Sequence, residues 1–136
     1  MINSLRNFFG VILGIVLGGA VNMGIIMISS KIIPPPAGTD LTTAEGLNAA
    51  MPMLEAKHFI MPFLAHALGT FVGAFAAASM AATRKNVIAI VIGCVNLFGG
   101  IWAVAIIPAP VWFDVVDLAL AYLPMAFLAH KFAWRN

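Results

Sequence analysis

Charged residues are scarce in this sequence of 136 residues: only 9% of the positions carry charge, whereas 62% are hydrophobic. A typical soluble domain is about 25% charged, so this chain has too few charges to cover a water-facing surface. The composition therefore excludes a soluble globular domain and a disordered segment. The seven basic and five acidic residues also cannot form the basic stripe that binds a nucleic acid.

Cysteine is almost absent, and this excludes two further classes. The single cysteine, Cys94, lies inside an apolar run, so the sequence predicts neither a disulfide framework nor a cysteine-based metal site. A phosphate-binding glycine loop, a CxxC motif and the Ser-His-Asp order of hydrolases are missing as well. We therefore expect no catalytic residues and no cofactor.

Long apolar runs are abundant, and four of them approach or exceed the length needed to cross a membrane. About 20 helical residues span a hydrocarbon core of roughly 30 Å. The expected spans are Phe8–Ser30, Phe59–Thr83, Val87–Ile107 and Val111–Phe132. Because no alternating strand pattern is present, the sequence predicts an all-α membrane protein, with residues 1–136 as a single four-helix domain. The first span starts like a secretory signal but stays apolar to Ile28, so we expect it to be retained.

The basic residues indicate how the four helices are oriented. Positive residues in short loops favour the cytoplasmic side. Most of them lie near the chain ends or in the turn between the second and third spans: Arg6, Arg84, Lys85, Lys131 and Arg135. All acidic residues lie in the other two connections. The sequence therefore predicts a bacterial inner-membrane protein, in contact with the lipid bilayer, with both termini in the cytoplasm.

The long outer connection, residues 31–58, begins with three prolines that favour an extended chain. Helix-compatible residues follow, with Asp40 or Thr42 as the expected cap. Thr42 and Glu45 also have the spacing of a capping box. We expect a short helix at the membrane interface in this segment.

Two short segments recur along the chain. Ile32-Ile33-Pro34-Pro35-Pro36 resembles Ile106-Ile107-Pro108-Ala109-Pro110, and Phe63-Leu64-Ala65-His66 recurs as Phe127-Leu128-Ala129-His130. These matches predict a parallel duplication of a two-helix hairpin, residues 1–83 and 84–136. Chance similarity between apolar segments is the alternative.

Glycines at four-residue spacing lie on one face of each of the first two spans. They are Gly10, Gly14, Gly18, Gly69 and Gly73. Small residues let membrane helices approach closely, so these faces predict packing within the chain. A homo-oligomer or a membrane protein partner that uses one of the faces is the alternative.

Three polar side chains, Asn22, His66 and Asn96, fall at membrane depth. An unsatisfied amide is costly there, so we expect the asparagines to face other helices, with a hydrogen bond between them as one arrangement. His66 is the natural proton-responsive group of the chain, because histidine titrates near pH 6.5 when unperturbed. Pro62 and Pro124 either interrupt the second helix of each hairpin or lie in its first turns, and inside a helix each would bend its axis.

Four ionisable residues lie near the outer ends of the second and fourth spans, here named the outer rim: Glu55, His58, Asp114 and Asp117. Glu55, His58 and His66 would share one face of a helix that begins before Glu55. Di-iron bundles use pairs of Glu-x-x-His motifs, and this chain has one such motif and an Asp-x-x-Asp. A proton or divalent-cation site is therefore one hypothesis. The simpler interpretation is that the aspartates stabilise a helix N-terminus.

Three segments resemble a family of small four-helix bacterial inner-membrane proteins to which no activity is assigned. The segments are Phe59-Ile60-Met61-Pro62-Phe63-Leu64-Ala65-His66-Ala67-Leu68-Gly69-Thr70, Pro108-Ala109-Pro110-Val111-Trp112-Phe113-Asp114 and Ala121-Tyr122-Leu123-Pro124-Met125. The resemblance covers most of the chain after Asn22 and implies a four-helix membrane protein, without a set of functional residues.

Three functional hypotheses follow, in descending order. The first is a protein that acts by helix packing, as an accessory subunit or a homo-oligomer. The second is a small transporter or channel with a polar axis of Asn22, His66 and Asn96 beneath an acidic outer mouth. The third is a metal-dependent membrane enzyme that uses the rim residues.

Overall fold

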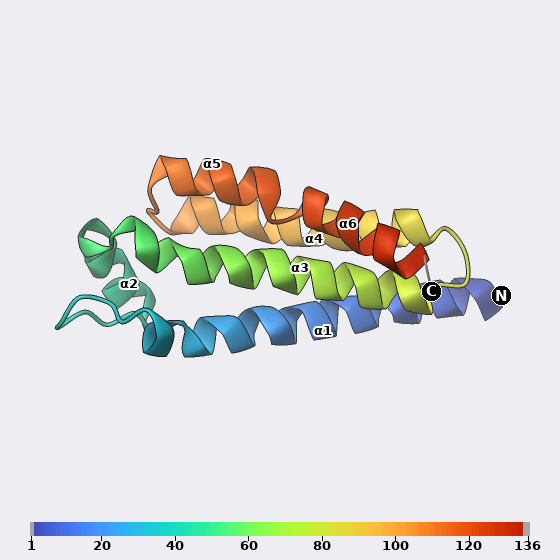
Figure 1. The fold of residues 1–136 in the computed structure, drawn as a ribbon, viewed down its shortest axis with the longest axis horizontal. Helices are drawn as coiled ribbons and strands as arrows, with labels where there is room; N and C mark the ends of the chain where they lie inside the picture. Colours follow the sequence, from blue (N-terminus) through green and yellow to red (C-terminus); the bar gives the residue numbers. More distant parts are fainter. Residues whose placement is uncertain (1, 135–136) are drawn as a thin grey trace.

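The computed structural model describes residues 2–134, which form an all-helical bundle (Figure 1). The elements are α1 (Ile2–Ile32), α2 (Ala44–Ala50), η1 (Met51–Met53), η2 (Ala56–Phe59), α3 (Ile60–Met80), α4 (Lys85–Ile106), α5 (Val111–Leu120) and α6 (Leu123–Trp134), where η denotes a short 3-10 helix. The described residues contain no strand, which confirms the all-α prediction. The first residues of α1 and the last of α6 lie at one end, here named the termini end, and α2 lies at the opposite, loop end.

Four helical segments of residues 2–134 are long and apolar enough to cross a membrane. They are Ile2–Ile32, Ala56–Met80, Lys85–Ile106 and Val111–Ala133. Large apolar side chains cover the outside of these segments: Val16, Met27 and Phe98 are each at least 60% exposed. A soluble protein rarely exposes so much apolar surface, whereas a lipid-facing surface consists of such side chains. The fold therefore fits an integral membrane protein.

Glycines bring α1 and α3 into backbone contact. Gly10, Gly14 and Gly18 are the buried residues of α1. A Cβ atom added to Gly14 would lie 2.5 Å from the carbonyl oxygen of Gly73, and one added to Gly18 would lie 2.7 Å from that of Gly69. A side chain does not fit at such distances, so the contact depends on glycine. The two glycine faces therefore fill each other within the chain.

Small residues also build the core that α3, α4 and α6 share toward the termini end. This alanine layer consists of Ala74, Ala77, Ala78, Ala89, Ile92, Ala126, Ala129 and Ala133. Ile92 is its one large side chain and is only 1% exposed. Alanine lets the helix backbones approach closely, so dispersion contacts replace the hydrophobic effect that lipid does not supply. The result is a dense apolar layer.

The fourth span is interrupted, whereas α3 is continuous. α5 ends at Leu120, and two residues separate it from α6. Pro124 explains the break, because it has no N–H for the Leu120 carbonyl and its ring clashes with a helical turn. Pro62 is the third residue of α3, where a missing N–H is tolerated. The break is covered by protein, since Ala121 is 0% and Tyr122 is 3% exposed.

A short helix, α2, forms in the long connection, but its cap differs from the expected one. The N-cap is Thr43, whose hydroxyl accepts a hydrogen bond of 3.0 Å from the backbone N–H of Gly46. Asp40 instead accepts hydrogen bonds from the backbone N–H and the hydroxyl of Thr42, at 2.8 and 2.6 Å. These bonds favour the ionised carboxylate and hold the pKa of Asp40 below its usual range.

A buried cluster closes the loop end of the bundle. Met51, Phe59 and Phe113 form this aromatic layer. The Phe59 ring packs 4.9 Å from the ring of Phe113 and edge-on against Trp112 at 5.5 Å. Such ring contacts add to the stabilisation that apolar burial provides. The aromatic layer joins the start of the second span to α5.

Candidate functional site

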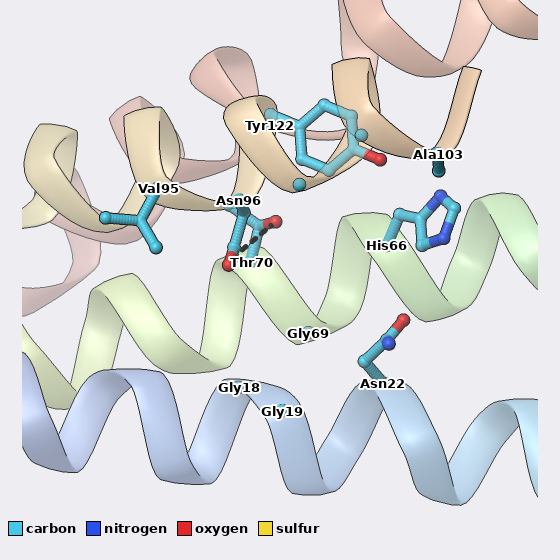
Figure 2. A pocket seen from close by; sticks show the side chains of 12 residues that line it. Gly18, Gly19, Asn22, His66, Gly69, Thr70, Val95, Asn96, Ala103 and Tyr122 are labelled. Carbon is cyan, nitrogen blue, oxygen red and sulfur yellow. Dashed lines mark hydrogen bonds between the residues drawn. The ribbon is translucent and has the colours of Figure 1, made fainter. Parts of the chain in front are cut away.

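A cavity of about 250 Å³ lies between α1, α3 and α4, with Tyr122 from the α5–α6 break in its wall. Its polar lining consists of Asn22, His66, Thr70, Asn96 and Tyr122 (Figure 2). Asn96 is the twelfth of the 22 residues of α4, so the cavity lies midway along that span. We name it the central cavity.

His66 and Asp117 pair beside this cavity. Nδ1 of His66 lies 2.9 Å from each carboxylate oxygen of Asp117. Tyr122 donates a further hydrogen bond of 2.8 Å from its hydroxyl to Oδ2 of Asp117. The side chain of Asp117 is only 6% exposed, whereas that of His66 is 27% exposed. The carboxylate is thus buried against its two donors, and both donors line the cavity, whereas Asp117 does not.

The Asp117 carboxylate sets the proton arrangement of the His66 ring. An ionised carboxylate accepts hydrogen bonds, so Nδ1 carries the proton that it donates, and the neutral ring then has its lone pair on Nε2. Among the described residues, no side chain or backbone group hydrogen-bonds to Nε2. His66 therefore offers an acceptor for a molecule in the cavity, or a donor once the ring is protonated.

Asn22 and Asn96 both line the cavity, but they do not hydrogen-bond to each other. Nδ2 of Asn96 donates to the hydroxyl of Thr70 at 3.0 Å. Oδ1 of Asn22 is buried and has no hydrogen-bond partner among residues 2–134. The expected contact between the asparagines is absent because Thr70, which belongs to no sequence motif, takes the Asn96 donor. A buried acceptor without a donor costs roughly 1–3 kcal/mol, so Oδ1 of Asn22 still needs a hydrogen-bond donor.

Glycines shape the cavity in two different ways. A Cβ atom added to Gly100 would lie 2.6 Å from the hydroxyl oxygen of Tyr122, so this glycine makes room for the Tyr122 side chain. Gly19 and Gly99 also line the cavity, and a Cβ atom added to either would meet no atom within 4 Å. These two positions therefore border open space.

The residues expected at the outer rim are not brought together as one group. The helix that follows Glu55 begins only at Ala56, so Glu55 and His66 do not share a helix face. His58 accepts a hydrogen bond of 2.9 Å from the backbone N–H of Glu55, and its Nε2 lies 3.1 Å from the Pro34 carbonyl oxygen. These contacts give His58 a structural role, in which it ties the long connection to η2.

The remaining rim residues have separate surroundings. Glu55 forms an exposed ion pair with Lys57 at 3.1 Å, and Asp114 lies in the first turn of α5. Asp117 lies three residues deeper and pairs with His66 rather than with Glu55 or His58. Within residues 2–134, no three His, Cys, Asp or Glu side chains are placed to hold a metal ion. The rim residues therefore do not form the divalent-cation site that was one of the hypotheses from the sequence.

The sequence indicates that His66 and Asp117 lie at a similar depth, because each has a similar position within its expected span. His66 lies seven residues after Phe59, and Asp117 lies six residues after Val111, where the expected spans begin at the same side. At 1.5 Å per residue, both side chains fall about 10 Å into the bundle. Tyr122 had no comparable signal, because its inward position depends on the helix break.

Comparisons with known proteins do not assign this chain to a family. No family model, no curated protein and no solved structure matches it. The function is therefore argued from the geometry of the central cavity.

Proposed function

We propose that this chain is a small membrane transport protein and that the central cavity is its substrate-binding site. The observation that carries the proposal is the set of hydrogen bonds from His66 and Tyr122 to the buried Asp117. This set presents an unpartnered imidazole nitrogen to a cavity midway along apolar helices. Ionisable groups at membrane depth are costly to place, and they mark substrate and proton pathways.

Helix packing alone, as an accessory subunit or a homo-oligomer, explains less of the structure. It accounts for the glycine faces, but these are already filled within the chain. It does not account for Asp117, because a buried ionic group is seldom better for stability than an apolar residue of similar volume. A partner or a second copy would have to bind a surface other than the glycine faces.

We further propose that the termini end faces the cytoplasm of a bacterial cell. Arg6, Lys85 and Lys131 lie in the parts of the helices at that end, and Arg84 lies in the turn between α3 and α4. Arg135 lies outside the described residues. Such an excess of positive residues favours the cytoplasmic side of an inner membrane. The long connection with α2 would then face the periplasm.

Cysteine labelling tests this orientation. In a Cys94→Ser background, Ala37→Cys and Asn86→Cys place single exposed thiols at the loop end and at the start of α4. We expect a membrane-impermeant maleimide to label intact cells only through Ala37→Cys, and to label Asn86→Cys after lysis. The opposite pattern would reverse the proposed orientation.

Retention of a bound molecule tests the proposed site, whatever the identity of the substrate. The protein is extracted in polymer nanodiscs without detergent, and the bound molecules are identified by mass spectrometry. Gly99→Leu adds a large side chain to the cavity lining, while Gly24→Leu is the matched control, because Gly24 also borders open space but does not line the cavity. We expect a molecule that both the unsubstituted protein and Gly24→Leu retain and that Gly99→Leu loses. Equal contents in all three proteins would refute the site.

A further inference from the structure

The central cavity opens sideways, between α1 and α4. Gly19, Val95 and Gly99 line it and are exposed; Gly19 belongs to α1, and the other two belong to α4. Figure 2 shows the α3 residues of the cavity lying between α1 and α4. α1 packs mainly on α3 and contacts α4 much less. In a bilayer, an opening at mid-height of these helices faces hydrocarbon rather than water.

Apolar side chains pack on both sides of the cavity along the bundle. Phe59 and Phe113 of the aromatic layer are 5% and 8% exposed and lie on the side of the loop end. On the other side, a Cβ atom added to Gly14 would lie 3.1 Å from Cδ1 of Ile92, so α1 and α4 meet there. The opening between α1 and α4 therefore offers a substrate a route into the cavity from the bilayer.

The lining of the cavity favours an uncharged head group that forms hydrogen bonds. No Lys or Arg lines it, so an anion such as a phosphate has no cationic partner. Two groups in the lining have no hydrogen-bond partner among residues 2–134: the Asn22 amide, with its buried acceptor Oδ1 and its donor Nδ2, and Nε2 of His66, which is an acceptor when the ring is neutral. Buried polar groups are satisfied by hydrogen-bond partners, and a hydroxyl group, which is uncharged and common on lipids, both donates and accepts.

The volume of the cavity limits how much of such a lipid it can hold. The cavity measures about 250 Å³, which is below the range of roughly 300–1,000 Å³ for sites that enclose a drug-sized ligand. A head group the size of a single sugar ring fits this space, whereas acyl chains do not. The acyl chains would remain outside, in contact with the apolar surfaces of α1 and α4.

We propose that the substrate is an uncharged lipid with a hydroxyl-bearing head group. The head group enters the central cavity from the bilayer and donates hydrogen bonds to Asn22 and His66, while the acyl chains stay in the opening between α1 and α4. This inference rests on the proposed transport function and adds the class of substrate. Passage to the other leaflet requires the aromatic layer or the alanine layer to part.

A fluorescent lipid in reconstituted vesicles tests this substrate class. The probe is a glucosyl diacylglycerol with a nitrobenzoxadiazole group on one acyl chain, and dithionite bleaches only the probe in the outer leaflet. Protein-free vesicles lose the outer-leaflet fraction and then stay constant. We expect vesicles with the protein to lose nearly all of the fluorescence, because the probe of the inner leaflet becomes accessible.

Two substitutions and one second lipid make the test specific. We expect Gly99→Leu, which adds a large side chain to the cavity lining, and Asn22→Leu, which removes an acceptor, to slow the second phase by about tenfold or more, as the loss of one buried hydrogen bond predicts. Gly24→Leu is expected to keep the original rate. A phosphatidylcholine with the same fluorophore, which carries charge and has no hydroxyl donor, is expected to stay in its leaflet.

The possible failures are distinguishable. If the nanodiscs retain a water-soluble molecule that Gly99→Leu loses and the glucosyl lipid does not move, the transport site stands and the lipid substrate is refuted. If both lipids move equally, selection of the head group is refuted. If no molecule is retained and neither lipid moves, the proposed function is refuted together with this inference.

Discussion

Gly18 and Gly19 are neighbours in α1, yet their surroundings are opposite. A Cβ atom added to Gly18 would lie 2.7 Å from the carbonyl oxygen of Gly69, whereas one added to Gly19 would meet nothing within 4 Å. Successive residues of a helix point in directions about 100° apart, so Gly18 is buried against α3 while Gly19 is exposed beside the cavity. Glycine therefore serves two purposes in this bundle: it allows close contact at one position and leaves open space at the next.

Gly14→Leu would test the close-contact role most severely. The added side chain would collide with the Gly73 backbone and with Ala77, whose Cβ lies 2.8 Å from the site of the new Cβ. We expect α1 to separate from α3, with a loss of about 3 kcal/mol, the upper end of overpacking costs. Reversible unfolding in mixed micelles measures this loss. Gly24→Leu is the control, and an equal effect of both substitutions would remove the contrast between the two kinds of glycine.

Asp117→Ala would test the buried pair beside the open space. The substitution removes the acceptor of both His66 and Tyr122 and leaves two donors without partners. We expect a loss of about 2 kcal/mol in the same unfolding measurement, since an unsatisfied buried polar group costs roughly 1–3 kcal/mol. His66→Ala in the Asp117→Ala background is expected to cost much less than His66→Ala alone. Additive losses would show that the two side chains act independently.

Gly99→Leu would test the open-space role through stability alone. Because nothing lies within 4 Å of the added Cβ, we expect the free energy of unfolding to stay within about 0.5 kcal/mol, as for a substitution on a surface. Leucine also has a higher helix propensity than glycine, and this favours the folded state. A loss as large as that of Gly14→Leu would mean that the cavity is closed in the membrane.

Asp40→Asn is expected to have the smallest effect, because the carboxylate lies outside the bundle. The hydrogen bonds from Thr42 lower the pKa of Asp40 from its ordinary value of 3.8. Their contribution to stability is therefore present above that ordinary value and is lost as the pH falls through the lowered folded value. We expect the variant to be slightly less stable than the unsubstituted protein at pH 7 and equal to it in strong acid. A difference that grows toward acid would contradict this assignment.

The four apolar segments and the two glycine faces could be predicted because both depend on local properties of the sequence. The length of an apolar run decides whether it can span a membrane, and small residues at four-residue spacing form a face whatever that face contacts. The depths of His66 and Asp117 within their spans are local properties as well and are similar. Their pairing is not local, because the sequence does not say that α3 and α5 are neighbours at that depth.

The cavity also could not be predicted from the sequence, because it depends on which helices are neighbours and where they diverge. Asn22 and Asn96 come from helices that both contact α3, and the intervening Thr70 decides their hydrogen bonds. The duplication of a hairpin stays a prediction. Its two FLAH segments have different surroundings, since Phe63-Leu64-Ala65-His66 lies in the continuous α3 and Phe127-Leu128-Ala129-His130 lies in α6, after the break.

The break between α5 and α6 divides the fourth span into two short rods. α5 has 10 residues and carries Asp117, and α6 has 12 residues and packs against the alanine layer. A junction without a continuous ladder of backbone hydrogen bonds can change its angle without unfolding either rod. Tilting of α5 at this hinge would part Phe113 from Phe59 and carry Asp117 away from His66, while α6 stays packed in the alanine layer. The helix break thus provides a hinge that an unbroken helix would lack.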